Sequence, residues 1–285
     1  MNIQWFPGHM TKTRRMIVEN ISLVDVVIEM LDARIPQSSK NPEIDNLTNN
    51  KPRIVVLNKS DLSDPSINME WSDYYFKKGN KVVFINSLNG EGIKQVQAAV
   101  VALMQEKLDR LKEKGRIFKS IKTMVLGIPN VGKSSFINRL AGKAVAETGD
   151  KPGVTRSKQW IRLNSQLELL DTPGILWPKF DDIETGLNLG FTGAIKDDIM
   201  DFSELACILL KRLSKLYPDN LRERFKLKAD FDESTGLDLL EEAGRNRGCL
   251  ISKGNVDYTR IAMIVLDEFR GGKIGKITLE RPTYD

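Results

Sequence analysis

Short apolar runs rich in β-branched residues recur through the first half of the chain, separated by polar stretches of helical length. Three of these runs span residues 24–28, 53–57 and 81–85. Continuous apolar runs, as opposed to strict apolar–polar alternation, are typical of strands buried on both faces of a parallel sheet. The pattern therefore predicts an α/β fold with a doubly wound, mostly parallel sheet.

Helical periodicity marks both ends of the chain. From Met10 to Ile21 apolar residues recur at helical spacing with lysine and arginine between them, which predicts a basic amphipathic helix. A long helix is predicted over residues 92–114. Beyond Pro178 the β-type runs cease, and helical spacing returns over residues 205–216, 237–243 and 258–269. We therefore expect one domain over residues 1–180 and a smaller, all-helical domain over 181–285.

Length and composition agree with two folded domains. The chain has 285 residues, of which 41% are hydrophobic, enough for two cores. Its two cysteines, Cys207 and Cys249, lie far apart, which predicts neither a zinc site nor a disulfide framework and favours the reducing cytoplasm. No export signal or membrane span is visible, because Asp25 and Glu29 interrupt the first apolar run. We expect a cytoplasmic monomer.

A phosphate-binding loop is predicted where the strand-like run Thr123–Gly127 meets the helical segment that begins at Lys133. The segment has the spacing Gly-x-x-x-x-Gly-Lys-Ser from Gly127 to Ser134. Glycines let backbone N–H groups surround phosphate oxygens, the lysine adds positive charge, and the Ser134 hydroxyl can bind Mg²⁺. The nucleotide contacts that we predict in this loop are Asn130, Val131, Gly132, Lys133, Ser134 and Ser135.

The segment Asp171-Thr172-Pro173-Gly174 follows a further apolar strand, residues 167–170. Asp171 is placed to hold Mg²⁺ through water, and the Gly174 N–H is placed to meet the γ-phosphate. A simple turn at the end of a strand is the alternative, because Asp and Pro-Gly are common turn formers. The phosphate loop favours the Mg²⁺ interpretation.

The choice of base is predicted by Asn58-Lys59-Ser60-Asp61. The Asp61 carboxylate can accept from the two N–H groups on one edge of guanine, which adenine does not offer. We expect the Lys59 stem to lie along the base, Asn58 to brace the loop, and Ser87 with the Leu88 amide to meet the guanine oxygen.

The guanine motif precedes the phosphate loop, which is the reverse of the order in ordinary small GTPases. The chain therefore resembles a circularly permuted GTPase with GTP or GDP and Mg²⁺ as cofactors. Between the loop helix and Asp171, Thr155 in the segment 151–156 is our candidate for a switch that closes on Mg²⁺ when the γ-phosphate is present. An exposed turn is the alternative for this segment.

Basic residues concentrate in the helical half, although the net charge of the whole chain is only +5. Residues 211–228 contain seven lysines and arginines against two acids, which is the pattern of a face that follows nucleic-acid phosphates. A solvated helix face is the alternative, since residues 230–242 are comparably acidic. The predicted surface continues to Arg245, Arg247, Lys253, Lys273 and Lys276.

Three further segments, Trp5–Met10, Asp32–Pro36 and Gly272–Glu280, extend the resemblance to nearly the whole chain. Together with the nucleotide motifs they resemble the YlqF/YawG family of ribosome biogenesis GTPases. The resemblance implies a bacterial factor that acts late in assembly of the large ribosomal subunit, with its C-terminal domain against ribosomal RNA and with ribosomal proteins, not DNA, as further partners. A metabolic P-loop kinase has no use for the guanine motif, whereas an RNA-binding scaffold that holds GTP without cycling is a real rival.

Hydrolysis needs a group that orients the attacking water. Ras-like enzymes use a glutamine after Gly174, but here that position is Ile175, a hydrophobic substitution that the resembled family shares and that implies slow intrinsic turnover. His9, the sole histidine, is one candidate replacement, with a packing or surface role as the alternative. Asn130 is the other, because loops of the form Pro-Asn-x-Gly-Lys-Ser resemble those of potassium-activated GTPases; simple loop geometry is its alternative. The predicted catalytic set is His9, Lys133, Thr155 and Gly174.

Overall fold

Six strands form one twisted sheet in the computed structural model of the chain, which describes residues 8–48, 51–115, 120–142, 159–163, 167–171, 182–195 and 201–284. The strand order is β3-β2-β1-β4-β6-β5. Every neighbouring pair is parallel except β5 and β6, which confirms the mostly parallel sheet. The strands are β1 (Val26–Asp32), β2 (Arg53–Asn58), β3 (Lys81–Ile85), β4 (Ile121–Gly127), β5 (Gln159–Arg162) and β6 (Leu167–Asp171).

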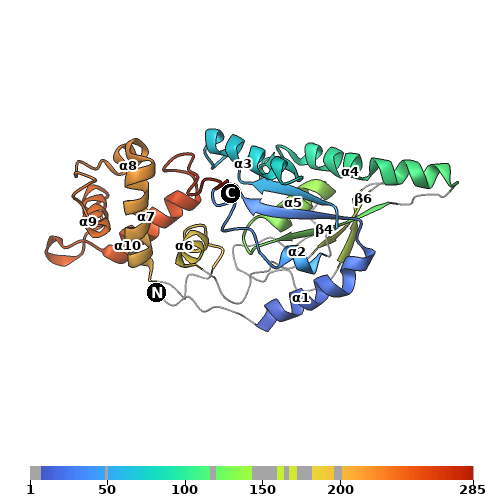
Figure 1. Ribbon diagram of the computed structural model, residues 1–285. Coiled ribbons are helices and arrows are strands. Elements are labelled where there is room, and N and C mark those ends of the chain that lie inside the picture. Colours follow the sequence, from blue (N-terminus) through green and yellow to red (C-terminus); the bar gives the residue numbers. More distant parts are fainter. Residues whose placement is uncertain are drawn as a thin grey trace.

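Helices cover both faces of this sheet (Figure 1). Side chains alternate along a strand, so Ile54 and Val56 of β2 enter one core while Val55 and Leu57 enter another. The first core contains α4 (Ile93–Glu113) and α5 (Lys133–Ala141). The opposite face packs against α1 (Gly8–Asn20), α2 (Ile44–Leu47) and α3 (Pro65–Lys77). The central strands are therefore buried on both sides, as their continuous apolar runs predict.

The first strand differs from the prediction, because it begins at Val26 and not at Val24. The Val24 N–H donates to the Ile21 carbonyl and closes a 3₁₀ turn, so it cannot pair with a neighbouring strand. Glu29, which interrupts the apolar run, lies inside the strand and is buried in a 2.9 Å ion pair with Arg53 of β2. The antiparallel edge strand β5 has no predicted counterpart.

A second hydrophobic core holds the helical domain, formed by α6 (Ile183–Phe191), α7 (Phe202–Leu216), α8 (Pro218–Phe225), α9 (Gly236–Asn246) and α10 (Tyr258–Arg270). Its central helix, α7, contacts the other four. Short polar caps fix where these helices begin: Asp201 accepts from two N–H groups of α7, and Thr235 forms a capping box with Asp238 on α9. None of the described helices is long and apolar enough to cross a membrane.

Helices α6 and α8 were not predicted from periodicity. α6 contains two glycines in its nine residues, and α8 has only eight residues with four charges among them, so neither carries a strong apolar repeat. The expected domain boundary at 180–181 falls outside the described residues.

The chain returns to the sheet after α10, and its end lies beside α3 (Figure 1). We call residues 272–281 the C-terminal tail. The Ile277 N–H donates to the Leu62 carbonyl at 2.9 Å, and the Leu279 N–H donates to the Arg34 carbonyl at 2.8 Å. The C-terminal tail therefore connects the helical domain to loops that follow β1 and β2.

Candidate guanine-nucleotide site

The predicted nucleotide motifs meet at the carboxyl edge of the sheet, where ligands of open α/β folds bind. Asn58, the last residue of β2, joins them through its buried side chain. Its amide nitrogen donates to the Val131 carbonyl of the phosphate loop at 2.6 Å and to the Ser87 hydroxyl at 3.0 Å, and its amide oxygen accepts from the Ser87 N–H at 3.0 Å. One side chain thus fixes the guanine motif, the phosphate loop and the loop after β3 relative to one another.

The phosphate loop requires glycine at both ends. A Cβ atom on Gly127 would lie 2.6 Å from the Met30 carbonyl oxygen, and one on Gly132 would lie 2.3 Å from the Asn58 amide nitrogen. Gly132 also adopts a left-handed φ of 102°, which side chains disfavour. Close packing against backbone at Gly127 and against the Asn58 side chain at Gly132 leaves no room for a Cβ atom, as expected of a loop whose N–H groups can surround phosphate oxygens.

Lys133 begins α5 and is buried beneath the loop. Its ammonium group donates to the carbonyls of Gly127 at 3.1 Å and Ile128 at 2.7 Å. Ser134 and Ser135 follow in the first turn and are half-buried. A buried cation beside the N-terminal N–H groups of a helix fits a polyphosphate, and the Ser134 hydroxyl is a suitable Mg²⁺ ligand in the same turn.

Lys59 adopts a left-handed φ of 61° and points its ammonium group at Asp32, at 3.0 Å. Asp32 also accepts a bidentate pair of bonds from Arg34, at 2.9 and 2.7 Å. Burial alone would raise the pKa of the Asp32 carboxyl, but the charges of Arg34 and Lys59 outweigh burial and hold it well below its usual range. Burial lowers the pKa of Lys59, and Asp32 opposes that shift. In the sequence, the segment Asp32–Pro36 was identified by resemblance only. Asp32, an acid at the end of a buried strand, was the local signal that could have identified it.

The remaining predicted base contacts lie on the same edge. Asp61 is half-buried, and its loop is fixed because the Ser60 hydroxyl donates to the Ile85 carbonyl at 3.0 Å. Leu88 is exposed, and its N–H donates to the Asn86 side chain at 2.8 Å. A bond from the Leu88 amide to the guanine oxygen would therefore replace the bond to Asn86.

Asn130 connects the phosphate loop to the helical domain. It has a left-handed φ of 55°, and its amide nitrogen donates to the Gly193 carbonyl, just after α6, at 2.8 Å. The same helix end is also held by Arg270, which donates to the Phe191 and Gly190 carbonyls at 3.1 and 2.9 Å. A potassium ion would use the amide oxygen of Asn130, whereas the bond to Gly193 uses the nitrogen.

Four predicted residues are only partly described or not described at all. Asp171 ends β6, next to β4, so its backbone lies at the same edge as the phosphate loop. His9 lies in α1. The side chains of both residues lie outside the described part of the structure, as do Thr155 and Gly174 entirely.

Comparison with known proteins agrees with this site. A family described as 50S ribosome-binding GTPase matches residues 122–224, a stretch that begins at the phosphate-loop strand and leaves out the guanine motif upstream. Ribosome biogenesis GTPase A of Bacillus cereus is 49% identical over 282 residues, covering 99% of this chain and 95% of that protein. The chain belongs to the ribosome biogenesis GTPase A family. It is accordingly a GTPase that binds GTP and GDP and takes part in ribosome biogenesis.

More distant members of this GTPase family and their structures extend the match. Mitochondrial ribosome-associated GTPase 1 of Mus musculus is 34% identical, with 98% of this chain and 90% of that protein covered. The structure of GNP-bound YlqF from T. maritima has a TM-score of 0.64 at 25% identity, with 95% and 98% of the two chains covered. The solved YlqF structure thus shares the architecture described above over almost its full length.

Proposed function

We propose that this GTPase binds the precursor of the large ribosomal subunit, promotes a late step of its maturation, and uses its GTP state to control association and release. The family supports a role in ribosome biogenesis, and the choice of the large subunit is our inference. The observation that supports the proposal is a basic pocket in the helical domain. Hydrogen bonds at Gly193 and along the C-terminal tail connect this domain to the GTPase site.

The basic pocket has a volume of about 570 Å³ and lies between the ends of α8 and α9 and the start of the C-terminal tail. Arg224 and Arg247 line it and share one acid, Glu268, at 2.8 and 3.1 Å. Lys226 and Lys273 also line it, and neither makes an ion pair among the described residues. Two unpaired ammonium groups beside two arginines suit the phosphates of an RNA backbone.

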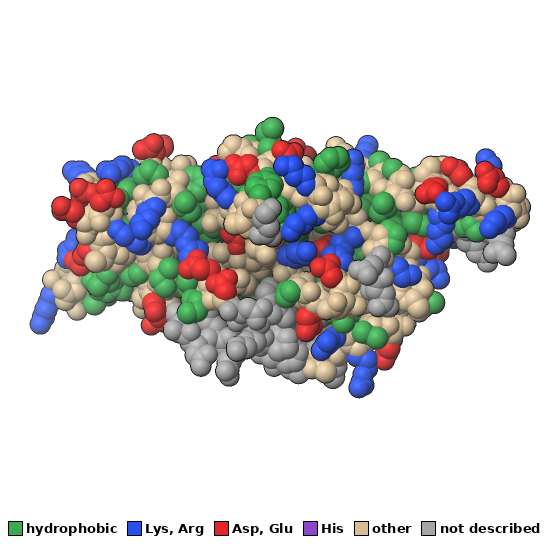
Figure 2. All heavy atoms as spheres, viewed as in Figure 1, with side chains coloured by type: hydrophobic (Ala, Val, Ile, Leu, Met, Phe, Trp, Pro, Cys, Tyr) green, Lys and Arg blue, Asp and Glu red, His purple; other side chains and the backbone are tan. Residues whose placement is uncertain are grey.

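Several of the basic residues at 211–228, which we predicted to face RNA, make contacts within the protein. Lys211 caps the carbonyls of Phe231 and Ser234, and Arg222 stacks on the Phe231 ring at 4.2 Å. Arg212 bonds Asn188, and Arg224 bonds Glu268. Four of the seven basic residues therefore serve the fold, and Figure 2 shows lysines and arginines interleaved with acids on this face of the helical domain. The predicted RNA-binding face over residues 211–228 therefore depends on fewer cations than the charge count suggests, because a count does not reveal which cations are already paired.

GTP hydrolysis with and without purified large subunits tests the proposal, together with subunit binding in GDP and in a non-hydrolysable GTP analogue. We expect stimulated turnover and binding that requires the analogue. The double variant Lys226→Ala/Lys273→Ala should lose subunit binding and stimulation while it keeps GDP affinity. Nucleotide-independent binding without stimulation would instead establish the scaffold role.

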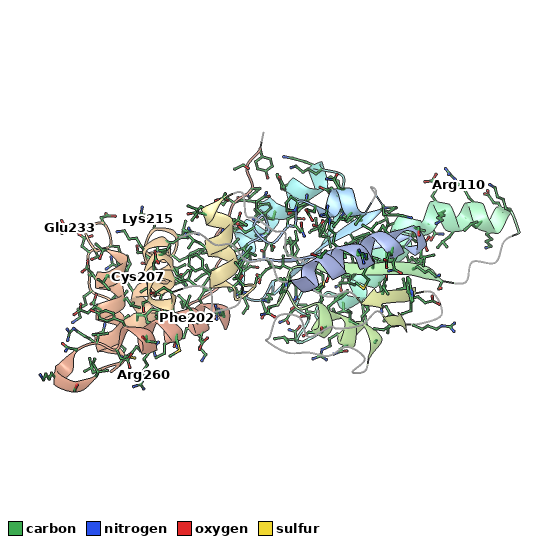
Figure 3. All side chains as sticks on the ribbon, turned by 90° about the horizontal axis from the view of Figure 1, so that it is seen from below. Arg110, Phe202, Cys207, Lys215, Glu233 and Arg260 are labelled. Carbon is green, nitrogen blue, oxygen red and sulfur yellow. The ribbon has the colours of Figure 1, made fainter. Side chains whose placement is uncertain are left out.

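A matched control removes two exposed lysines elsewhere. Lys112→Ala/Lys114→Ala changes the end of α4, which lies at the opposite end of the molecule from the helical domain, near Arg110 in Figure 3. This variant should bind subunits normally. Equal loss of binding in both double variants would mean that the basic pocket has no special role and that total charge alone drives binding.

We further propose Ser134, Thr155 and, through water, Asp171 as the Mg²⁺ ligands, and Asn130 as a ligand for potassium. Support for potassium is the loop sequence around Asn130 and the carbonyl oxygen that its side chain carries. Turnover should be faster in potassium chloride than in sodium chloride at equal ionic strength, and Asn130→Ala should abolish the difference. Equal rates of the unchanged protein in the two salts would exclude the potassium role.

A further inference from the structure

Arg34 lies between the guanine site and the end of the helical domain. Its Nε and Nη2 groups bind Asp32, while its Nη1 group donates to the Arg270 carbonyl at the end of α10, at 3.3 Å. Its guanidinium carbon lies 5.4 Å from the centroid of the Phe269 ring. The three edges of one guanidinium are thus divided between Asp32 and the last turn of α10, where the partial negative charge of the helix end attracts a cation.

Asp32 connects Arg34 to Lys59, and so to the base-binding loop. One of its carboxylate oxygens accepts from both Arg34 and Lys59, at 2.7 and 3.0 Å. Asp32 and Arg34 are fully buried, whereas 23% of the Lys59 side chain stays exposed at the site. Lys59 is therefore held at its ammonium end, which leaves the stem in a fixed position for the face of a guanine.

The C-terminal tail reinforces both loops at once. The Thr278 hydroxyl accepts from the Asp64 N–H at 3.0 Å and donates to the Ala33 carbonyl at 3.4 Å. The Ile277 N–H donates to Leu62, one residue beyond Asp61. The loop that carries Lys59 and Asp61 and the loop that carries Arg34 are consequently joined by a segment that belongs to the helical domain.

A role in the fold alone explains these contacts poorly. The buried Arg34 and the half-buried Lys59 share one carboxylate, and a buried ion pair is on average no more stabilising than well-packed apolar side chains of the same volume. The arrangement does, however, hold the ammonium group of Lys59 within hydrogen-bonding distance of Asp32. Precise placement of a group that contacts a ligand is where a rigid polar network has its clearest advantage.

We propose that Asp32 and Arg34 are positioning residues for the guanine base, and that docking of α10 and the C-terminal tail on Arg34 sets the affinity for guanine nucleotides. The coupling concerns the base and is therefore equal for GDP and GTP. It is separate from any signal that depends on the γ-phosphate, and it does not require the ribosomal role proposed above.

Arg34→Met tests the proposal, with GDP and a non-hydrolysable GTP analogue measured by equilibrium binding. We expect both affinities to fall by the same factor, about tenfold, since a hydrogen-bonded charge is lost from the network. The kcat at saturating GTP should stay unchanged while KM rises. Inhibition by pyrophosphate, which occupies the phosphate loop without a base, should also stay unchanged. Arg34→Lys keeps the charge beside Asp32 and should recover part of the affinity.

Arg281→Met is the matched control, because it makes the same chemical change at an arginine of the C-terminal tail, where it removes only an ion pair with Glu70 on α3. It should leave GDP affinity unchanged. An unchanged GDP affinity in folded Arg34→Met, or an equal loss of pyrophosphate inhibition, would overturn the proposal. Should Arg34→Met fail to fold, Thr278→Val decides: we expect GDP binding to weaken about threefold, and unchanged binding would refute the coupling.

Discussion

Asn58→Ala should destabilise the GTPase domain by an amount that follows from three hydrogen bonds. The side chain makes one bond to Val131 and two to Ser87, all between buried groups. Each such bond contributes about 1 kcal/mol net, so the free energy of unfolding should fall by about 3 kcal/mol. Ser60→Ala, in the same motif, removes a single bond to the Ile85 carbonyl and should cost about 1 kcal/mol.

Urea denaturation followed by tryptophan fluorescence separates these two values. The four tryptophans, at positions 5, 71, 160 and 177, all precede the helical domain, so the signal reports on the GTPase half. With a denaturant slope of about 2 kcal/mol per molar, the midpoint should fall by about 1.5 M for Asn58→Ala and by about 0.5 M for Ser60→Ala. A loss in Asn58→Ala no larger than that in Ser60→Ala would refute the idea that Asn58 joins the three loops.

Three further outcomes are expected. Asp61→Asn should weaken GTP binding by about a hundredfold or more in competition assays. It should improve XTP binding, because an amide can donate to the extra carbonyl of xanthine. An unchanged base preference would contradict the assignment of Asp61 to the base. The pKa of Asp32 is depressed in the folded state, so its contribution to stability is present above the unfolded value of about 3.9 and is lost as the pH falls below it. The urea midpoints of the unchanged protein and of Asp32→Asn should therefore differ most above about pH 5, and the difference should shrink steadily as the pH falls below about 3.9, whereas a constant difference would count against the shift. His9→Ala should lower turnover by about a hundredfold or more while GTP affinity is kept, and equal turnover of the two proteins with and without ribosomes would remove His9 from the mechanism.

The sequence predicted best what depends on local pattern. The strand over residues 81–85 agrees to the residue, and the phosphate loop lies between a strand and a helix as its spacing requires. Asn58 was expected to brace its loop, and the structure identifies Val131 and Ser87 as its partners. These features depend on glycine conformation, apolar periodicity and fixed motif spacing, all of which are visible over a few residues.

What the sequence could not predict depends on partners far along the chain. Glu29 interrupts an apolar run and is tolerated in the sheet only because Arg53 of the next strand neutralises it. Lys211 counts as a surface charge until its contacts with two carbonyls are known. The return of the C-terminal tail to Leu62 has no local signal, because both segments are irregular in structure and are separated by more than 200 residues.

Because these two segments are far apart in the sequence, they are also translated at different times. The loop carrying Lys59 and Asp61 leaves the ribosome early, while Thr278, which bonds to Asp64 only three residues beyond Asp61, is made after the entire helical domain. Because domains fold from the N-terminus during translation, the guanine loop folds first without its last partners. A nascent chain that already has every nucleotide motif therefore still holds an unfinished site, and full affinity for GTP arises only when the helical domain has been completed and docked.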